Sequence, residues 1–95
     1  MNIYLITQLI NNKSESYNGA IVFAKDEEEA RNIHPNHNLV YKDNVGWVYK
    51  LCYNIQEPSG DNSWCNPKDV KVELLGVANK EITRSHVILS SYGGL

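Results

Sequence analysis

Two runs near the amino end of the chain are apolar at almost every position. Ile3 to Ile10 alternates imperfectly, and Ala20 to Ala24 is an unbroken run that is too short for a helix and rich in β-branched and aromatic residues. Both runs are typical of strands that are buried on both faces. The polar segment between them closes with Asn18-Gly19, a dipeptide suited to positive φ, so we expect an antiparallel hairpin.

The segment after the second run predicts a short helix. Asp26 stands at the N-cap position, and Glu29 completes a D-x-x-E capping box with three glutamates in the first turn. Ala30 and Ile33 are three residues apart, so they lie on one face and can pack the helix onto the sheet. Pro35 removes the next backbone donor and disfavours helical geometry at the residue before it. We therefore expect two helical turns that end at this proline.

An aromatic strand is expected in the middle of the chain. A short apolar run at residues 39–41 is a candidate edge strand, and Val45 to Ile55 follows with clear alternation. One face of this second strand is aromatic or apolar and carries Trp47, Tyr49, Leu51 and Tyr53. A loop rich in turn-forming residues, 56–63, separates it from the last third of the chain.

The last third predicts a helical turn and two strands. Asn66 is a suitable cap, and Pro67 suits the first helical position. Val70 to Leu75 alternates as a half-exposed strand that Gly76 ends, and His86 to Tyr92 is a final strand. These elements predict an α+β fold: a small, mainly antiparallel sheet of four to six strands, one short packed helix and a second helical turn. We expect one domain, residues 1–95.

Composition narrows the function classes. The chain is 42% hydrophobic and 21% charged, as in ordinary soluble globular proteins, and its net charge of −2 lacks the basic character of a nucleic-acid-binding protein. The amino terminus has no signal-peptide pattern, and no apolar run approaches the about 18 residues of a membrane span. Cys52 and Cys65 do not form a disulfide framework. We expect a reduced cytoplasmic protein that binds neither membrane nor nucleic acid.

Three segments carry recognisable motifs. They are A-x-x-x-E-E-A-R-x-I-H-P at residues 24–35, W-x-x-P-x-D-V-x-V-E-L-L-G-x-A at residues 64–78, and V-I-L-S-S-Y at residues 87–92, before a glycine-containing tail. Together with the opening I-Y-L-I-T, they resemble a family of small, mostly uncharacterised proteins that bacteriophages and prophages encode. The resemblance breaks down over residues 37–63, which we interpret as an insertion.

This resemblance implies a role against host defence. Phage accessory proteins of this size often bind defence enzymes or sequester the nucleotide signals that defence systems use. Our leading hypothesis is a phage-type anti-defence accessory protein in the host cell cytoplasm, a homo-oligomer that sequesters a nucleotide-derived immune signal without catalysis. The alternatives are a direct protein-binding inhibitor of a host defence enzyme, similar to an anti-CRISPR, and in third place a small hydrolase.

The candidate ligand-binding residues are aromatic, cationic or placed at a helix start. Aromatic rings can stack on a base or form the core, and an arginine can bind a phosphate or pair with acidic residues of its own helix. The turn after Asn66 is less acidic at its start than the first helix, so it is the better anion site. The candidates are Arg84, Trp47, Tyr49, Trp64, Asn66 and Arg31.

We expect no catalytic residue, metal or cofactor. The side chains that can bind zinc are His34, His37, Cys52, Cys65 and His86. They lack the paired cysteines of a zinc site, so the cysteines are expected in the core and the histidines in polar loops. Ser90-Ser91 lies in no recognisable nucleophile turn.

The aromatic strand also predicts self-association. A strand added by insertion needs a partner for its backbone and a cover for its apolar face, which a core of this size is too small to supply. A symmetric oligomer supplies both. We expect the interface to include residues 45–55 and to form a ligand pocket lined by Arg84 and Trp47.

Overall fold

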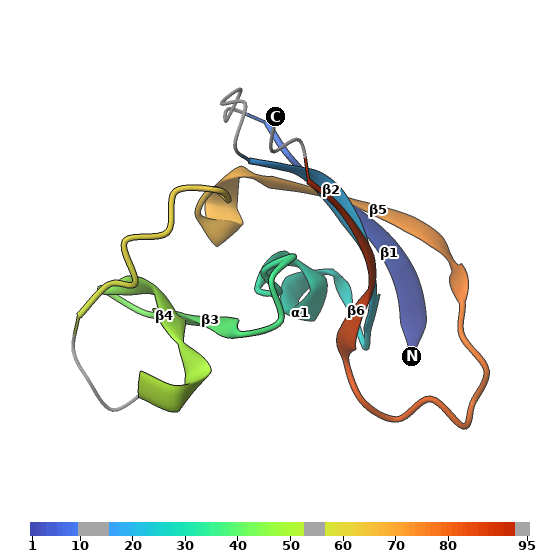
Figure 1. The fold of residues 1–95 in the computed structure, drawn as a ribbon. Helices are drawn as coiled ribbons and strands as arrows, with labels where there is room; N and C mark the ends of the chain where they lie inside the picture. Colours follow the sequence, from blue (N-terminus) through green and yellow to red (C-terminus); the bar gives the residue numbers. More distant parts are fainter. Residues whose placement is uncertain (10–15, 53–56, 93–95) are drawn as a thin grey trace.

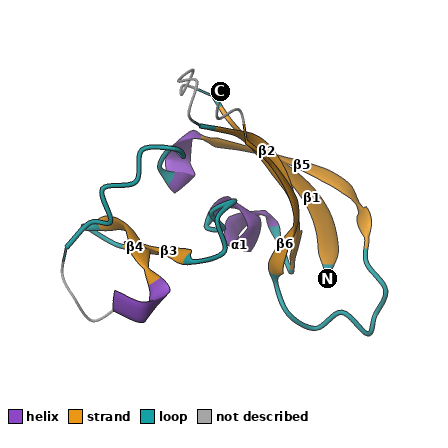
Figure 2. Cartoon of the chain, viewed as in Figure 1, coloured by secondary structure: helices purple, strands orange, loops and turns teal. Residues whose placement is uncertain are grey.

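The computed structural model describes residues 1–9, 16–52 and 57–92 (Figure 1). Its main element is an antiparallel sheet of four strands in the order β5-β1-β2-β6, and β3 and β4 form a separate hairpin. The elements in chain order are β1 (Asn2–Gln8), β2 (Tyr17–Ala24), α1 (Glu27–Arg31), β3 (Leu39–Lys42), β4 (Gly46–Tyr49), the 3-10 turns η1 (Lys50–Cys52) and η2 (Pro67–Asp69), β5 (Val70–Val77) and β6 (His86–Tyr92). Strands dominate (Figure 2), and the predicted α+β fold is confirmed.

One face of the four-stranded sheet, the inner face, holds the core. The sheet curves around α1, and the β3–β4 hairpin lies farther out on the same side (Figure 1). The buried residues come from every layer: Tyr4, Ile6, Ala20, Val22, Ala24, Ala30, Trp47, Trp64, Cys65 and Val70. Each fully buried aliphatic side chain contributes about 1.5–3 kcal/mol, so this face provides most of the stability.

The opposite, outer face of the sheet has no cover among the described residues (Figure 1). Because side chains alternate along a strand, Leu5 and Thr7 of β1 and Ile21 and Phe23 of β2 point to this side. All four are half-buried by their neighbours in the sheet rather than fully buried. The prediction that the first two strands are buried on both faces is therefore wrong for the outer face.

The start of α1 follows the predicted cap. The Asp26 carboxylate accepts a hydrogen bond of 2.8 Å from the backbone N–H of Glu29, as an N-cap should. The Glu29 carboxylate in turn accepts one of 2.9 Å from the N–H of Lys25, one residue before the usual capping-box partner. Ala30 is buried against the sheet, as predicted.

The helix ends earlier than predicted. Its last residue is Arg31, and Asn32 is the C-cap, whose side-chain amide donates to the carbonyl of Glu28 at 2.8 Å. Ile33 has left the helix and forms a β-bridge with Val40. Tertiary pairing with the hairpin therefore ends the helix before the proline.

The aromatic strand is also shorter than its pattern predicts. β4 ends at Tyr49, which pairs with Leu39, the first residue of β3, so the chain beyond it has no strand partner and turns into η1. Trp47 is buried, whereas Tyr49 is 48% exposed and Leu51 fully exposed. Tyr53 lies outside the described residues. The expected aromatic face is not one continuous surface.

Two glycines lie inside strands rather than at turns. Gly19 is in β2 opposite Thr7 and lacks the predicted positive φ. A Cβ there would lie 2.8 Å from the carbonyl oxygen of Ile6, so the glycine permits close backbone approach. Gly76 pairs with Ile3 after a bulge, so β5 continues past the position at which we expected it to end.

Two later elements match their predictions, and no span was found. β6 has the predicted bounds, and η2 forms at the predicted Asn66-Pro67 start. Among the described residues, no helix has the length and apolar character needed to cross a membrane.

Candidate functional site: a groove beside strand β6

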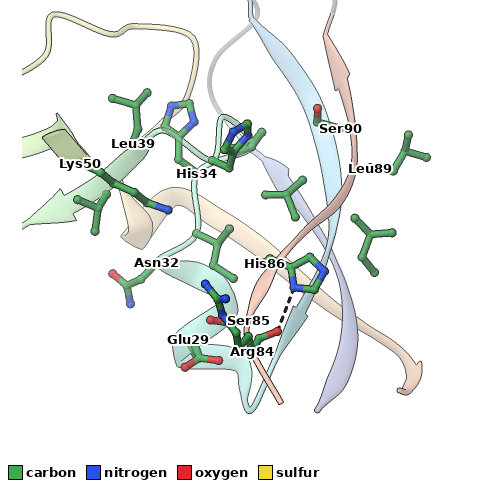
Figure 3. A pocket seen from close by; sticks show the side chains of 16 residues that line it. Glu29, Asn32, His34, Leu39, Lys50, Arg84, Ser85, His86, Leu89 and Ser90 are labelled. Carbon is green, nitrogen blue, oxygen red and sulfur yellow. Dashed lines mark hydrogen bonds between the residues drawn. The ribbon is translucent and has the colours of Figure 1, made fainter. Parts of the chain in front are cut away.

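A groove of about 770 Å³ runs along β6 on the side that faces α1 and the hairpin (Figure 3). We call it the β6 groove. One wall is formed by the consecutive residues 84–90. Consecutive residues can line it because β6 is an edge strand, whose backbone borders the groove together with its side chains. The other wall is formed by Glu29, Asn32, Ile33, His34, Pro35, His37, Leu39, Val40 and Lys50.

Two positively charged side chains line the groove without a charged partner among the described residues. Lys50 extends into it from the hairpin side, and Arg84 lies at its other end near Glu29 and Ser85 (Figure 3). No side-chain hydrogen bond or ion pair joins Arg84 or Lys50 to another described residue. The Glu29 carboxylate already accepts a hydrogen bond at the helix cap. In a protein of net charge −2, this groove therefore favours an anion.

The His86 ring lies toward the outer side of β6, and one of its nitrogens has a defined proton. Its Nδ1 lies 3.1 Å from the carbonyl oxygen of Arg84, which can only accept, so Nδ1 carries a proton. The ring packs edge-on against Phe23, with centroids 4.9 Å apart.

Behind the groove, His34 is buried and both of its nitrogens are engaged. Nδ1 accepts from the backbone N–H of Asn36 at 2.8 Å, so it is unprotonated, and Nε2 therefore donates to Asp61 Oδ2 at 2.8 Å. The other carboxylate oxygen of Asp61 accepts from the hydroxyl of Ser63 at 2.7 Å. This chain of bonds ties the turn after α1 to the loop before η2.

Aromatic rings surround this buried histidine. Tyr17 and Trp47 meet the His34 ring edge-on at centroid distances of 5.8 and 4.9 Å, and Trp64 is tilted at 6.3 Å. Burial lowers the pKa of His34 below its ordinary value, and the bond to Asp61 opposes that shift without reversing it. His34 is therefore neutral near neutral pH and holds the core together.

The hydroxyl groups near His34 and in the groove are not arranged as nucleophiles among the described residues. The Ser63 hydroxyl is directed at Asp61 and not at an imidazole, so Asp61, His34 and Ser63 are not in the order of a nucleophilic triad. Ser90 lines the groove, but no described carboxylate or imidazole is hydrogen-bonded to it.

The expectation that the histidines are polar loop residues is wrong for His34, because its side chain is buried among aromatic rings.

The two arginines among the candidates have different environments. Arg84 lines the β6 groove, exposed and unbonded to other described residues. The Arg31 guanidinium instead donates to the carbonyls of Val70 at 2.6 Å and Pro67 at 3.2 Å, which joins α1 to the start of β5. Arg31 therefore bonds to backbone carbonyls and not to the acidic residues of its own helix.

The other four candidates lie outside the groove. Trp47 is buried and its indole N–H donates to the carbonyl of Cys65 at 2.9 Å, while the buried Trp64 Nε1 has no partner among the described residues. Tyr49 is partly exposed on the hairpin. Asn66 precedes η2 but makes no side-chain cap hydrogen bond. The structure thus brings only Arg84, of the six, to the groove wall.

Metal-ligating side chains are dispersed in the described part of the chain. No three His, Cys, Asp or Glu residues come together there. Cys65 is buried in the core, as expected, and burial raises the pKa of its thiol to about 11. The side chain of Cys52 lies outside the described residues.

Comparison with known proteins gave no counterpart: no protein-family model, curated protein or solved structure matches the chain. Sequence reasoning also missed Lys50 and His37 as groove residues. The only sequence feature that could have indicated them is that both flank the short strands of the hairpin. The sequence alone does not show that this part of the hairpin lies next to β6.

Proposed function

We propose that this protein is a binding module that captures a small anionic molecule, of the nucleotide-derived class, in the β6 groove without transforming it. The observation that carries the proposal is a pair of cations, Arg84 and Lys50, that lie in one groove of about 770 Å³ and have no side-chain bond to another described residue. A volume of this order is typical of small-molecule sites. Guanidinium and ammonium groups at two points match phosphates at two points of one ligand.

The groove also offers groups for the rest of a nucleotide. Ile33, Leu39 and Val40 give it an apolar floor suited to a base or sugar. Asn32 and the free backbone edge of β6 supply donors and acceptors for base recognition. No nucleophile with an aligned base is present among the described groove residues, so we propose retention of an intact ligand.

The anti-defence role within this proposal rests on the three phage-type motifs of the sequence. A protein that retains a nucleotide signal lowers its free concentration when the protein is in excess over the signal. The role therefore requires tight binding and a high copy number, and it requires no turnover.

A direct protein-binding inhibitor is the second candidate. The observation in its favour is the acidic start of α1, where Asp26, Glu27 and Glu28 are exposed side by side. Such a surface complements the basic nucleic-acid channels of defence enzymes. In this case α1 and not the β6 groove contacts the target.

The test is a retention experiment. The purified protein is incubated with a panel of cyclic and linear nucleotides, separated from free ligand, heated to release what it holds, and the released molecules are identified by mass. We expect intact recovery of at least one nucleotide. Recovery of a converted product identifies an enzyme, and no retention across the panel overturns the proposal.

Matched charge variants locate the site. Arg84→Glu and Lys50→Glu each reverse a groove charge and should abolish retention, with melting temperatures close to the parent because neither side chain is bonded to other described residues. Lys68→Glu is the control, since Lys68 is exposed on η2 and does not line the groove. Equal loss of retention in all three variants would show a general charge effect and reject the groove.

A further inference from the structure

The outer face of the sheet displays two rows of side chains of contrasting size. The strand registers align four large side chains in one row across the sheet. A second row, two residues away on each strand, holds three smaller residues and one lysine. We call them the large row and the small row. The large row is Glu73, Leu5, Ile21 and Leu89, and the small row is Lys71, Thr7, Gly19 and Ser91.

The small row forms a depression in this face. A hollow of about 270 Å³ is lined by the uncharged members of both rows, Gly19 among them, together with Asn18, Ala20 and Ser90. Gly19 cannot fill it with a side chain of its own, because a Cβ there would lie 2.8 Å from the Ile6 carbonyl oxygen and 3.0 Å from Thr7 Cγ2. The hollow is thus fixed by backbone packing.

We propose that a second copy of this chain covers the outer face, related by a two-fold axis that lies in the interface and crosses the strands between the two rows. A rotation about that axis places each strand over its own counterpart, reversed in direction. The large row of one subunit then lies over the small row of the other. Ile21 enters the hollow at the partner's Gly19, and Leu5 and Leu89 meet the partner's Thr7 and the partner's Ser91.

The charges at the edge of the sheet support this axis in particular. Lys71 and Glu73 are exposed on the same face of β5, one in each row. The proposed rotation brings each Lys71 over the partner's Glu73, so two ion pairs form per dimer. An axis parallel to the strands would instead place β5 over the partner's β6. The two residues that β6 contributes to the rows, Leu89 and Ser91, are uncharged, so no ion pair would form.

The size of the face sets the expected affinity. Four strands about 4.8 Å apart and seven residues long span roughly 19 by 23 Å. The sheet bends away at both ends on this side (Figure 1), so contact concentrates on the two rows. Such an interface lies at the low end of the size range of specific complexes. We therefore expect a dimer that dissociates in the micromolar range.

This inference is independent of the proposed function. The two-fold contact uses the outer face, whereas the candidate ligand lies in the β6 groove on the other side of the edge strand, and Leu89 and Ser90 border both hollows. It also differs from the expected interface at residues 45–55, where Trp47 lies in the core and Tyr49 on the surface.

The first test is sedimentation velocity of the full chain over a series of concentrations from micromolar upward. We expect a monomer–dimer equilibrium. Leu89→Ser removes an exposed leucine from the large row and should weaken dimerisation by about tenfold or more. Leu74→Ser is the matched control, because Leu74 is a similarly exposed leucine whose register partner Tyr4 belongs to the inner face. A monomer at every concentration, or equal effects of the two variants, overturns the proposal.

Charge exchange tests the axis itself. Lys71→Glu and Glu73→Lys each place like charges together twice per dimer, so each should weaken dimerisation by about tenfold at low salt. The double exchange Lys71→Glu with Glu73→Lys restores opposite charges across the axis and should recover the affinity of the parent. If the double variant is as weak as the single ones, or if none of them changes the affinity, the proposed axis is wrong.

Discussion

The two faces of the four-stranded sheet are built from the same strands but differ in burial. On the inner face, Ile6 and Val22 are fully buried beneath α1 and the aromatic residues around His34. On the outer face, Leu5 and Ile21 occupy the neighbouring strand positions and have no cover among the described residues. The apolar pattern of β1 and β2 is similar on both sides. An apolar pattern therefore predicts which side chains are favourable to bury, whereas the topology determines which other element, if any, covers them.

The largest expected effect is a direct comparison of the two faces. Ile6→Ala leaves a cavity in the core, so it should lower the free energy of unfolding by about 2–5 kcal/mol. Ile21→Ala is the same substitution on the adjacent strand and opposite face, and it should cost less than about 1.5 kcal/mol in the monomer. Urea unfolding at a concentration below self-association measures both. Equal costs would show that the outer face is also covered within one chain.

The next effect concerns the polar centre of the inner side. His34→Phe leaves the Asp61 carboxylate and the Asn36 N–H without their partner in a buried site, at about 1–3 kcal/mol for each unsatisfied group. His37→Phe is the control, because His37 is exposed and three residues away. Thermal unfolding of the two variants should therefore differ clearly, and similar melting temperatures would reject a structural role for His34.

His34 also predicts the direction of the pH dependence. Its pKa is lowered in the folded protein, mainly by burial, so between the folded and unfolded values the unfolded chain binds more protons. The stability from His34 is complete above its unfolded pKa of about 6.5 and is lost as the pH falls below that value. The titratable groups that face His34 are Asp61 and Tyr17. The slope should persist in His37→Phe and disappear in His34→Phe.

These comparisons also show which features the sequence could predict. The cap at Asp26, the bounds of β6 and the turn at Asn66-Pro67 depend on residues within a few positions of each other, and all three were predicted correctly. The end of α1 was not, since it depends on the bridge between Ile33 and Val40. Local patterns predict where elements begin and fail where a distant partner ends them.

The environment of the residues around the candidate site depends on contacts between distant parts of the chain even more strongly. His34 bonds to Asp61, 27 positions further along the chain, so its burial had no local signal. Arg31 and Arg84 look alike as isolated arginines, yet carbonyls of Pro67 and Val70 engage the first and leave the second for the groove. Both arginines were candidates from the sequence, and the fold places only Arg84 on the wall of the β6 groove.

A smaller effect tests the cap that supports the inner side. Asp26→Ala removes the acceptor for the Glu29 N–H and should cost about 0.5–2 kcal/mol. Ligand retention should be unchanged at temperatures where the variant is folded, because Asp26 does not line the β6 groove. Asp43→Ala, at an exposed position of the hairpin turn, is the control. Lost retention with an unchanged melting temperature would place Asp26 in the binding site instead.

The smallest expected effect separates folding from association on the outer face. Leu89 is 64% exposed on an edge strand, so Leu89→Ser removes little buried area and should change the monomer's free energy of unfolding by no more than about 0.5 kcal/mol. The same variant should lose the concentration dependence of the melting temperature that a dimer confers, since a partner that binds only the folded chain raises its apparent stability. Thermal unfolding of the parent, Leu89→Ser and Leu74→Ser across the same concentrations measures both quantities at once. A destabilised monomer in Leu89→Ser would mean that the leucine contributes to the fold of a single chain, and the two faces would then differ less than their exposure suggests.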